Sequence, residues 1–246
     1  MARYADGSLG PFSGKVGKIV GSYWKGRFVM RAAPDVSHVI SSPARLLQQQ
    51  KFAIMAKYLH PLKGIINIGF AHEAELRKVT PRNVAMSVNM ANGMNWNGTG
   101  WEVSFESVQL SNGLFLGVDD LTVILQGTDM VVRWRSQNPA VAGLTSTGKE
   151  VWTAATDKVD VVFYNIQRGE TLLIVDQRDS GGVVQPVPTD WVNGQNVVVY
   201  VVTIPAKIAE YEADPQSVTE AGLQYVTELY RDGFAVSNTA AGNVTL

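Results

Sequence analysis

Basic and aromatic side chains are interleaved in a short segment near the N-terminus, and these residue types together can bind an acidic partner. Lysine and arginine neutralise phosphates or carboxylates, and aromatic rings stack on bases or anchor protein interfaces. We predict that this segment docks on an acidic protein surface or on neighbouring subunits. Nucleic acid is the alternative partner. A second alternative is that the segment is a charged face exposed to solvent and binds no partner. The predicted interface residues are Lys15, Lys18, Tyr23, Trp24, Lys25, Arg27, Phe28 and Arg31.

Two tryptophans bracket a turn in the middle of the chain. Trp96 and Trp101 flank Asn97-Gly98-Thr99-Gly100, a composition typical of a tight turn. Aromatic rings that are exposed on a free protein often become buried when a protein partner binds, or they stack on the rings of sugars. Trp96 and Trp101 are therefore predicted interface residues, with the anchoring of a strand corner as the alternative. Trp134 lies in an alternating apolar run and is expected to point into the core.

The residue types that carry catalysis form no recognisable motif. Gly14-Lys15-Val16-Gly17-Lys18 lacks the spacing and the Ser or Thr of a phosphate-binding loop. His38, His60 and His72 are scattered, whereas a metal site needs three or four converging ligands. Asp119-Asp120 is interpreted as a solvated turn rather than as calcium ligands or glycosidase carboxylates. A Ser-His-Asp triad stays open, because its members need not be close in sequence. We expect no catalytic, cofactor-binding or metal-binding residue, and therefore no enzyme.

Composition narrows the class of protein further. The chain has 246 residues, no cysteine, 46% hydrophobic residues and 17% charged residues. The absence of cysteine excludes disulfides, thiolate zinc sites and a cysteine nucleophile, and the low charge argues against disorder. The first residues show no apolar run of a signal peptide, and no segment reaches about 18 uncharged apolar residues. We expect synthesis in the cytoplasm and no membrane insertion.

A net charge of −1 conceals an uneven distribution of charge. Residues 1–82 carry 13 bases and 4 acids, a balance of +9, whereas residues 83–246 carry 8 bases and 18 acids, a balance of −10. Such a split indicates different surroundings for the two parts. We predict an N-terminal unit over residues 1–82 and a β-rich region over residues 83–246.

The N-terminal unit is predicted to contain a hairpin and helices. Glycines punctuate β-forming residues, which predicts strands over residues 15–24 and 27–31 joined by a turn at Lys25-Gly26. A two-stranded ribbon is only marginally stable alone, so it is expected to pack on a helix or on another subunit.

Two serine- or threonine-proline pairs predict helix starts. Ser42 is the expected N-cap of a helix over residues 44–59, with Pro43 in its first turn, where the missing N–H costs nothing. Thr80-Pro81 repeats this signal before a short helix over residues 82–91.

Short apolar runs separated by Asn-Gly and Gly turns follow residue 92. Such regularly spaced runs predict the strands of an immunoglobulin-like β-sandwich. Division of this region into two sheet halves stays open. Residues 159–164 are expected to be buried on both faces. A helical insertion is expected near residues 215–230, and a last strand over 234–246. The predicted strands cover residues 102–110, 121–125, 130–135, 151–153, 159–166, 171–176 and 197–204. The predicted fold class is mainly β, an immunoglobulin-like sandwich preceded by a basic hairpin and helix unit.

Several motifs resemble an uncharacterised family that is abundant in Bacteroidetes and known only as a domain of unknown function. They include Gly10-Pro11-Phe12-Ser13-Gly14-Lys15-Val16-Gly17, Val20-Gly21-Ser22-Tyr23-Trp24-Lys25-Gly26 and Asn67-Ile68-Gly69-Phe70. The resemblance spans nearly the whole chain and departs from the family around residues 206–232. It implies no activity, and it suggests a bacterial or phage origin.

These observations favour a non-catalytic structural or interaction protein of a larger assembly. One specific hypothesis is a virion component, an auxiliary capsid or decoration protein that docks through its basic N-terminal arm. Virion proteins are made in the cytoplasm and need no disulfides. The alternatives are a nucleic-acid-binding protein that uses the basic segment and a carbohydrate-binding sandwich that uses Trp96 and Trp101.

Overall fold

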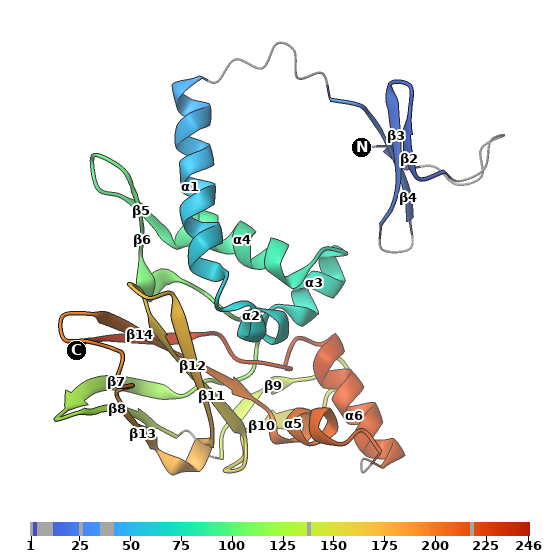
Figure 1. The fold of residues 1–246 in the computed structure, drawn as a ribbon. Coiled ribbons are helices and arrows are strands. Elements are labelled where there is room, and N and C mark those ends of the chain that lie inside the picture. Colours follow the sequence, from blue (N-terminus) through green and yellow to red (C-terminus); the bar gives the residue numbers. More distant parts are fainter. Residues whose placement is uncertain (1, 4–11, 25–26, 35–41, 137–138, 217–218) are drawn as a thin grey trace. The chain divides into compact units, whose positions relative to one another are not determined.

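The computed structural model describes residues 2–3, 12–24, 27–34, 42–136, 139–216 and 219–246. Its contacts divide the chain into two units, Met1–Leu47 and Gln48–Leu246, which are described separately below. The fold is mainly β and is built from antiparallel sheets with several helices (Figure 1). The division falls after Leu47, so the helices of residues 48–82 belong by contact to the same unit as the β-rich residues.

The first unit is a four-stranded antiparallel sheet in the order β1-β4-β3-β2. Its strands are β1 (Ala2–Arg3), β2 (Gly14–Val16), β3 (Ile19–Trp24) and β4 (Arg27–Ala32). The predicted strand over residues 15–24 is divided in two, because Gly17 adopts a φ of +58° and turns the chain between β2 and β3. The pairing of β3 with β4 confirms the predicted hairpin, whose turn at Lys25-Gly26 lies outside the described residues.

Gly21 permits a close approach within this sheet. A Cβ atom at Gly21 would lie 2.4 Å from the carbonyl oxygen of Phe12 and 2.7 Å from its ring. Glycine in a strand often marks such an approach, and here it lets Phe12 lie directly against β3.

Helices α1 (Pro43–Leu59), α2 (Lys63–Gly69), α3 (Ala71–Arg77) and α4 (Pro81–Asn92) follow. The Ser42 hydroxyl oxygen accepts a hydrogen bond from Arg45 N at 3.3 Å, and the Thr80 hydroxyl oxygen accepts one from Asn83 N at 3.2 Å. Both predicted helix starts are confirmed. Among the described residues, no helix combines the length and apolarity needed to cross a membrane.

Two larger sheets organise the second unit. The four-stranded sheet has the order β12-β11-β14-β15, and the three-stranded sheet has the order β13-β8-β7. Two hairpins, β5–β6 and β9–β10, and helices α5 and α6 complete the unit. The bounds are β5 Met94–Trp96, β6 Trp101–Val103, β7 Asp119–Gln126, β8 Asp129–Arg135, β9 Val141–Leu144, β10 Glu150–Trp152, β11 Lys158–Asn165, β12 Glu170–Gln177, β13 Gly182–Pro186, β14 Asn196–Ile204, β15 Ala240–Thr245, α5 Ala206–Ala213 and α6 Glu220–Arg231.

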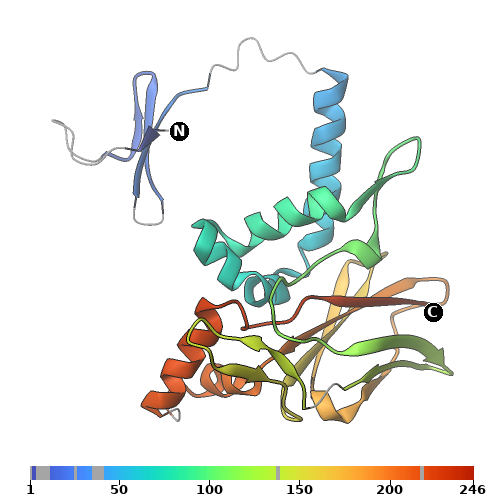
Figure 2. The same ribbon diagram turned by 180° about the vertical axis from the view of Figure 1, so that it is seen from behind.

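Strands β11 and β14 are buried on both faces because they separate two cores. On one face, Val161 and Phe163 pack against Met130 and Trp134 of β8, forming an inter-sheet core. On the other face, Val162 and Tyr164 belong to a helix-side core with residues of α1, α2 and α6. Figures 1 and 2 show the helices and the three-stranded sheet on opposite sides of the four-stranded sheet. The expected burial of residues 159–164 and of Trp134 is confirmed.

Some predicted elements are wrong in extent. Residues 102–110 do not form one strand: β6 ends at Val103, and a short 3₁₀ helix, Phe105–Ser107, follows. Leu110 N instead donates to the Thr239 hydroxyl oxygen at 2.8 Å, a distant side-chain partner that replaces a strand ladder. The expected helical insertion is present as α6, but α5 before it was not predicted. The last strand is shorter than residues 234–246 and spans only β15.

Candidate functional site

The register of the first sheet places the described basic residues of its strands on one side of the sheet. Directly opposite residues of an antiparallel pair share a face, and successive residues alternate between faces. Val20 pairs with both Lys15 and Arg31, and Trp24 pairs with Arg27. These five residues therefore lie on one side of the sheet, which we call the basic face.

The other side of the same sheet is apolar and aromatic. Ile19 pairs with Val16, and Tyr23 pairs with Phe28, whose ring centroid lies 4.9 Å from that of Tyr23. Tyr23 is 60% exposed and Val16 is 63% exposed. We call this side the apolar face.

The predicted interface residues of the N-terminal segment thus divide between two faces. Lys15, Trp24, Arg27 and Arg31 lie on the basic face, and Tyr23 and Phe28 on the apolar face. Lys18 lies in the turn between β2 and β3, and Lys25 is outside the described residues. Composition alone did not reveal this separation, because it depends on the register of pairing.

The charge of the chain follows the division into units. Residues 1–47 carry seven bases and two acids, a balance of +5, and residues 48–246 carry fourteen bases and twenty acids, a balance of −6. Both acids of the first unit, Asp6 and Asp35, lie outside the described residues. Among the described residues of the first unit there is therefore no carboxylate side chain.

The two predicted tryptophans of the second unit meet on the β5–β6 hairpin. Trp96 pairs directly with Trp101, and their ring centroids are 5.4 Å apart in an edge-to-face arrangement. The Asn97 side-chain oxygen accepts hydrogen bonds from Thr99 N at 3.0 Å and Gly100 N at 2.8 Å, which fixes the turn. Trp96 remains 46% exposed. The hairpin holds two rings in a defined orientation at the surface.

An aromatic groove of about 540 Å³ lies beside Trp101. Tyr58 packs edge-on against Tyr164 with ring centroids 4.9 Å apart, and its hydroxyl lies 2.5 Å from that of Tyr200. Burial raises the pKa of Tyr58 well above its usual range, so these phenols stay protonated at neutral pH. The groove is lined by Ile54, Lys57, Tyr58, Trp101, Glu102, Val103, Phe105, Tyr164 and Ile166.

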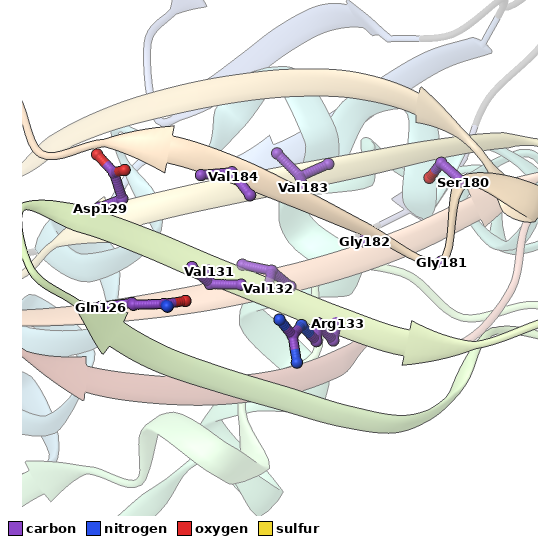
Figure 3. Close-up of a pocket in the computed structure, with 10 residues that line it drawn as sticks. All are labelled: Gln126, Asp129, Val131, Val132, Arg133, Ser180, Gly181, Gly182, Val183 and Val184. Atoms are coloured by element: carbon purple, nitrogen blue, oxygen red, sulfur yellow. The ribbon is translucent and has the colours of Figure 1, made fainter.

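A second groove of about 540 Å³ lies on strands β8 and β13 (Figure 3). Val131, Val183 and Val184 line it, with Asp129 and Arg133 as its charged groups. It contains none of the predicted interface residues, and Figure 3 shows its polar side chains spread along the groove, with Asp129 and Ser180 at opposite ends.

Asp119 and Asp120 lie at the start of β7 and form ion pairs with Arg135. Asp120 adopts a φ of +51° at an irregularity in the β7–β8 register, and its carboxylate lies 3.2 Å from Arg135. Within the described ranges, no three His, Asp or Glu side chains gather so as to hold a metal ion, and His38 lies outside those ranges.

One buried ion pair was missed by the sequence analysis. Arg178 is fully buried, and its Nε donates to the Asp157 carboxylate at 3.1 Å. Arg178 also donates to the carbonyl oxygens of Leu116 and of Gly117, the latter at 2.9 Å. Asp157 accepts further bonds from Ala154 N and Ala206 N. Every polar atom of this cluster is used in tying together loops, which identifies a structural role.

A family model described as "Family of unknown function (DUF6266)" matches residues 11–211 of the chain. A search of the curated proteins found no match.

Proposed function

Because the chain belongs to DUF6266, a family of unknown function, we propose its function from the geometry: it is a non-catalytic interaction protein whose N-terminal unit docks through the basic face onto an acidic protein surface. The observation that carries this proposal is the separation of the two faces of the first sheet. Lys15, Arg27 and Arg31 lie on one side together with Trp24. The second unit of another copy carries a complementary balance of −6 and would be one such acidic partner.

The residue types on the basic face suit a protein interface. Arginine and tryptophan are enriched at such interfaces, and they dominate binding energy where they are buried by the partner. Trp24 is exposed and adjacent to Arg27, so one partner could cover both. The charge complementarity would mainly speed encounter and fix orientation.

The small core of the first unit also supports docking on a partner. Among its described residues, Val29 is the only buried apolar side chain. Small folded units bury a smaller share of their surface than large domains do and are correspondingly marginal in stability. Docking would supply the missing contacts.

Two finer proposals extend this one. The packing of two antiparallel sheets on one apolar core supports an immunoglobulin-like arrangement of the second unit. A cysteine-free chain with a docking unit supports membership of a virion, as an auxiliary capsid or decoration protein.

The test measures binding of the full chain to fluorescent polyglutamate and to a short DNA duplex at low and high salt. We expect polyglutamate binding that weakens with salt, is lost in Arg31→Glu and is retained in Arg45→Glu. Arg45 is an exposed arginine of the same unit at the start of α1, so it matches the change in charge. Arg31-dependent binding to the duplex alone would replace the proposal with nucleic-acid binding, and binding to neither probe would refute it.

Carbohydrate binding is a second candidate, supported by the edge-to-face Trp96–Trp101 pair beside the aromatic groove. Ligand sites are typically concave and apolar with a few polar groups, and Lys57 and Glu102 supply these here. Titration with cello- and chito-oligosaccharides, followed by calorimetry, tests it. We expect binding that Trp96→Ala abolishes and Trp152→Ala retains, since Trp152 is similarly exposed on β10. No heat of binding with either oligosaccharide would remove this candidate.

A further inference from the structure

Strand β12 is an edge of the four-stranded sheet. It pairs with β11 along its full length of eight residues, and no other described strand pairs with it. An edge strand presents unpaired N–H and C=O groups, which another strand can bind.

Two backbone hydrogen bonds determine which residues of β12 direct these groups outward. Arg178 N donates to Asp157 O at 2.8 Å at the end of the β11–β12 ladder, and Ile166 N donates to Asn196 O at 3.1 Å on the β14 side. Opposite residues in an antiparallel pair alternate between bonded and non-bonded pairs. The first bond therefore shows that the even-numbered residues of β12 direct their backbone N–H and C=O groups toward β11. The second bond shows that the even-numbered residues of β11 direct their backbone groups toward β14. This agrees with the first bond, which leaves the odd-numbered residues of β11 to pair with β12.

The open part of the edge is short and well defined. The odd-numbered residues Thr171, Leu173, Val175 and Gln177 direct their backbone groups away from β11. Gln177 is already satisfied, because its N–H donates to the Asp176 carboxylate at 2.7 Å and its carbonyl accepts from the Ser180 hydroxyl at 2.9 Å. Three residues remain, with one donor and one acceptor each.

The side chains of this edge favour pairing over solvation. Leu173 is 55% exposed and Val175 is 54% exposed, while Leu172 and Ile174 pack against the inter-sheet core. Edge strands are usually protected by lysine, proline or a bulge. Residues 170–177, Glu-Thr-Leu-Leu-Ile-Val-Asp-Gln, contain no lysine or proline, and their register with β11 is regular.

We propose that β12 pairs antiparallel with β12 of a second copy across a two-fold axis, with Leu173 opposite Leu173. A two-fold axis makes this contact isologous and closed. The four-stranded sheets of the two copies then join into one continuous sheet. This interface is separate from the basic face, and it does not depend on the proposed function.

In the proposed register, each open backbone N–H or C=O group of one copy meets one partner group of the other copy. Thr171 lies opposite Val175 of the other copy, and Leu172 lies opposite Ile174, so β-branched or apolar side chains meet at each of these positions. All three open residues of each copy then exchange hydrogen bonds. A shift that places Leu173 opposite Val175 would place Thr171 opposite Gln177, whose backbone groups are occupied.

The register has one electrostatic cost at its ends. Glu170 lies opposite Asp176 of the second copy, and like charges directly opposite are unfavourable. Arg168 offsets part of this cost, because its Nε lies 2.8 Å from the Glu170 carboxylate. The second copy is a better occupant than an unrelated peptide, because its edge has the same length and the same open groups.

The first experiment measures the mass of the full chain by sedimentation over a range of concentrations, at low and at high salt. We expect a dimer of twice the 26.8 kDa chain mass that persists at high salt. Leu173→Lys should weaken dimerisation by at least about tenfold, because it opposes two cations and removes an apolar pair. Leu76→Lys is the matched control, since Leu76 is 67% exposed on α3. Circular dichroism verifies that both variants fold.

A second experiment tests the register, and the cysteine-free chain leaves no background. Under mild oxidation, Leu173→Cys should form an intermolecular disulfide, because Cα atoms of a bonded pair lie about 5.5 Å apart. Val175→Cys, which is equally exposed, should not. A monomer at all concentrations, a dimer unaffected by Leu173→Lys, or cross-linking of Val175→Cys in place of Leu173→Cys would overturn the proposal. A dimer that dissociates in salt would point to the basic face instead.

Discussion

The buried pair Asp157–Arg178 should make a large contribution to stability, and Arg178→Met measures it. The guanidinium is fully buried and donates to one carboxylate and two carbonyl groups. Removing one partner of a buried pair costs about 3–5 kcal/mol, because the other charge is left uncompensated. Asp157 keeps two backbone donors, from Ala154 and Ala206. The expected loss is therefore about 3 kcal/mol, at the low end of that range.

Urea unfolding followed by circular dichroism gives this loss as a shift in the transition midpoint. Arg133→Met is the matched control, because Arg133 is exposed on β8, and a change within about 0.5 kcal/mol is expected there. The double variant Asp157→Asn/Arg178→Met should lose less than the sum of the two single variants, since both partners are then uncharged. A loss below about 1 kcal/mol for Arg178→Met would show that the guanidinium is not desolvated as described.

Three further predictions follow from individual contacts. Gly113→Ala should destabilise the protein by at least about 2 kcal/mol, because a Cβ there would lie 1.8 Å from the carbonyl oxygen of Val236, whereas Gly100→Ala meets no atom within 4 Å and serves as the control in the same unfolding assay. Hydrogen bonds from Arg231 and Ser146 N lower the pKa of Asp232 to about 2, so its stabilising effect is complete above its ordinary pKa of 3.8 and is lost as pH falls toward 2. The free energy of unfolding of Asp232→Asn should therefore depend less on pH between about 4 and 2 than that of the unchanged protein. An unchanged pH dependence would contradict this role of Asp232. If a duplex does bind the basic face, its three described cations predict a slope of about −3 for log K against log salt, and Arg31→Glu should reduce the magnitude of that slope by about 1 or more.

Local signals in the sequence predicted the parts of the fold that depend on neighbouring residues. Ser42-Pro43 and Thr80-Pro81 start helices because the cap and the proline act within one turn. Residues 159–164 were expected to be buried on both faces, since a run that is apolar at every position except Asp160 is typical of a strand between two cores.

Long-range contacts account for most of what was not predicted. Residues 102–110 are as apolar as a strand, but Leu110 and Ser111 bond to Thr239, a partner that no local pattern indicates. The candidate site was found by residue type, whereas its division into a basic and an apolar face depends on which residues pair across β2, β3 and β4. The edge of β12 likewise becomes visible only when the sheet order is known.

The two faces of the first sheet are encoded only by whether a residue occupies an odd or an even place along each strand. Substituting one basic residue removes one contact, but deleting a single residue within β3 moves the side chains beyond the deletion to the opposite side. Trp24 would then leave the side that holds Lys15 and Val20, and its cross-strand relation to Arg27 would be broken. Among natural variants, this segment should therefore accept exchanges of side chains far more readily than changes of length.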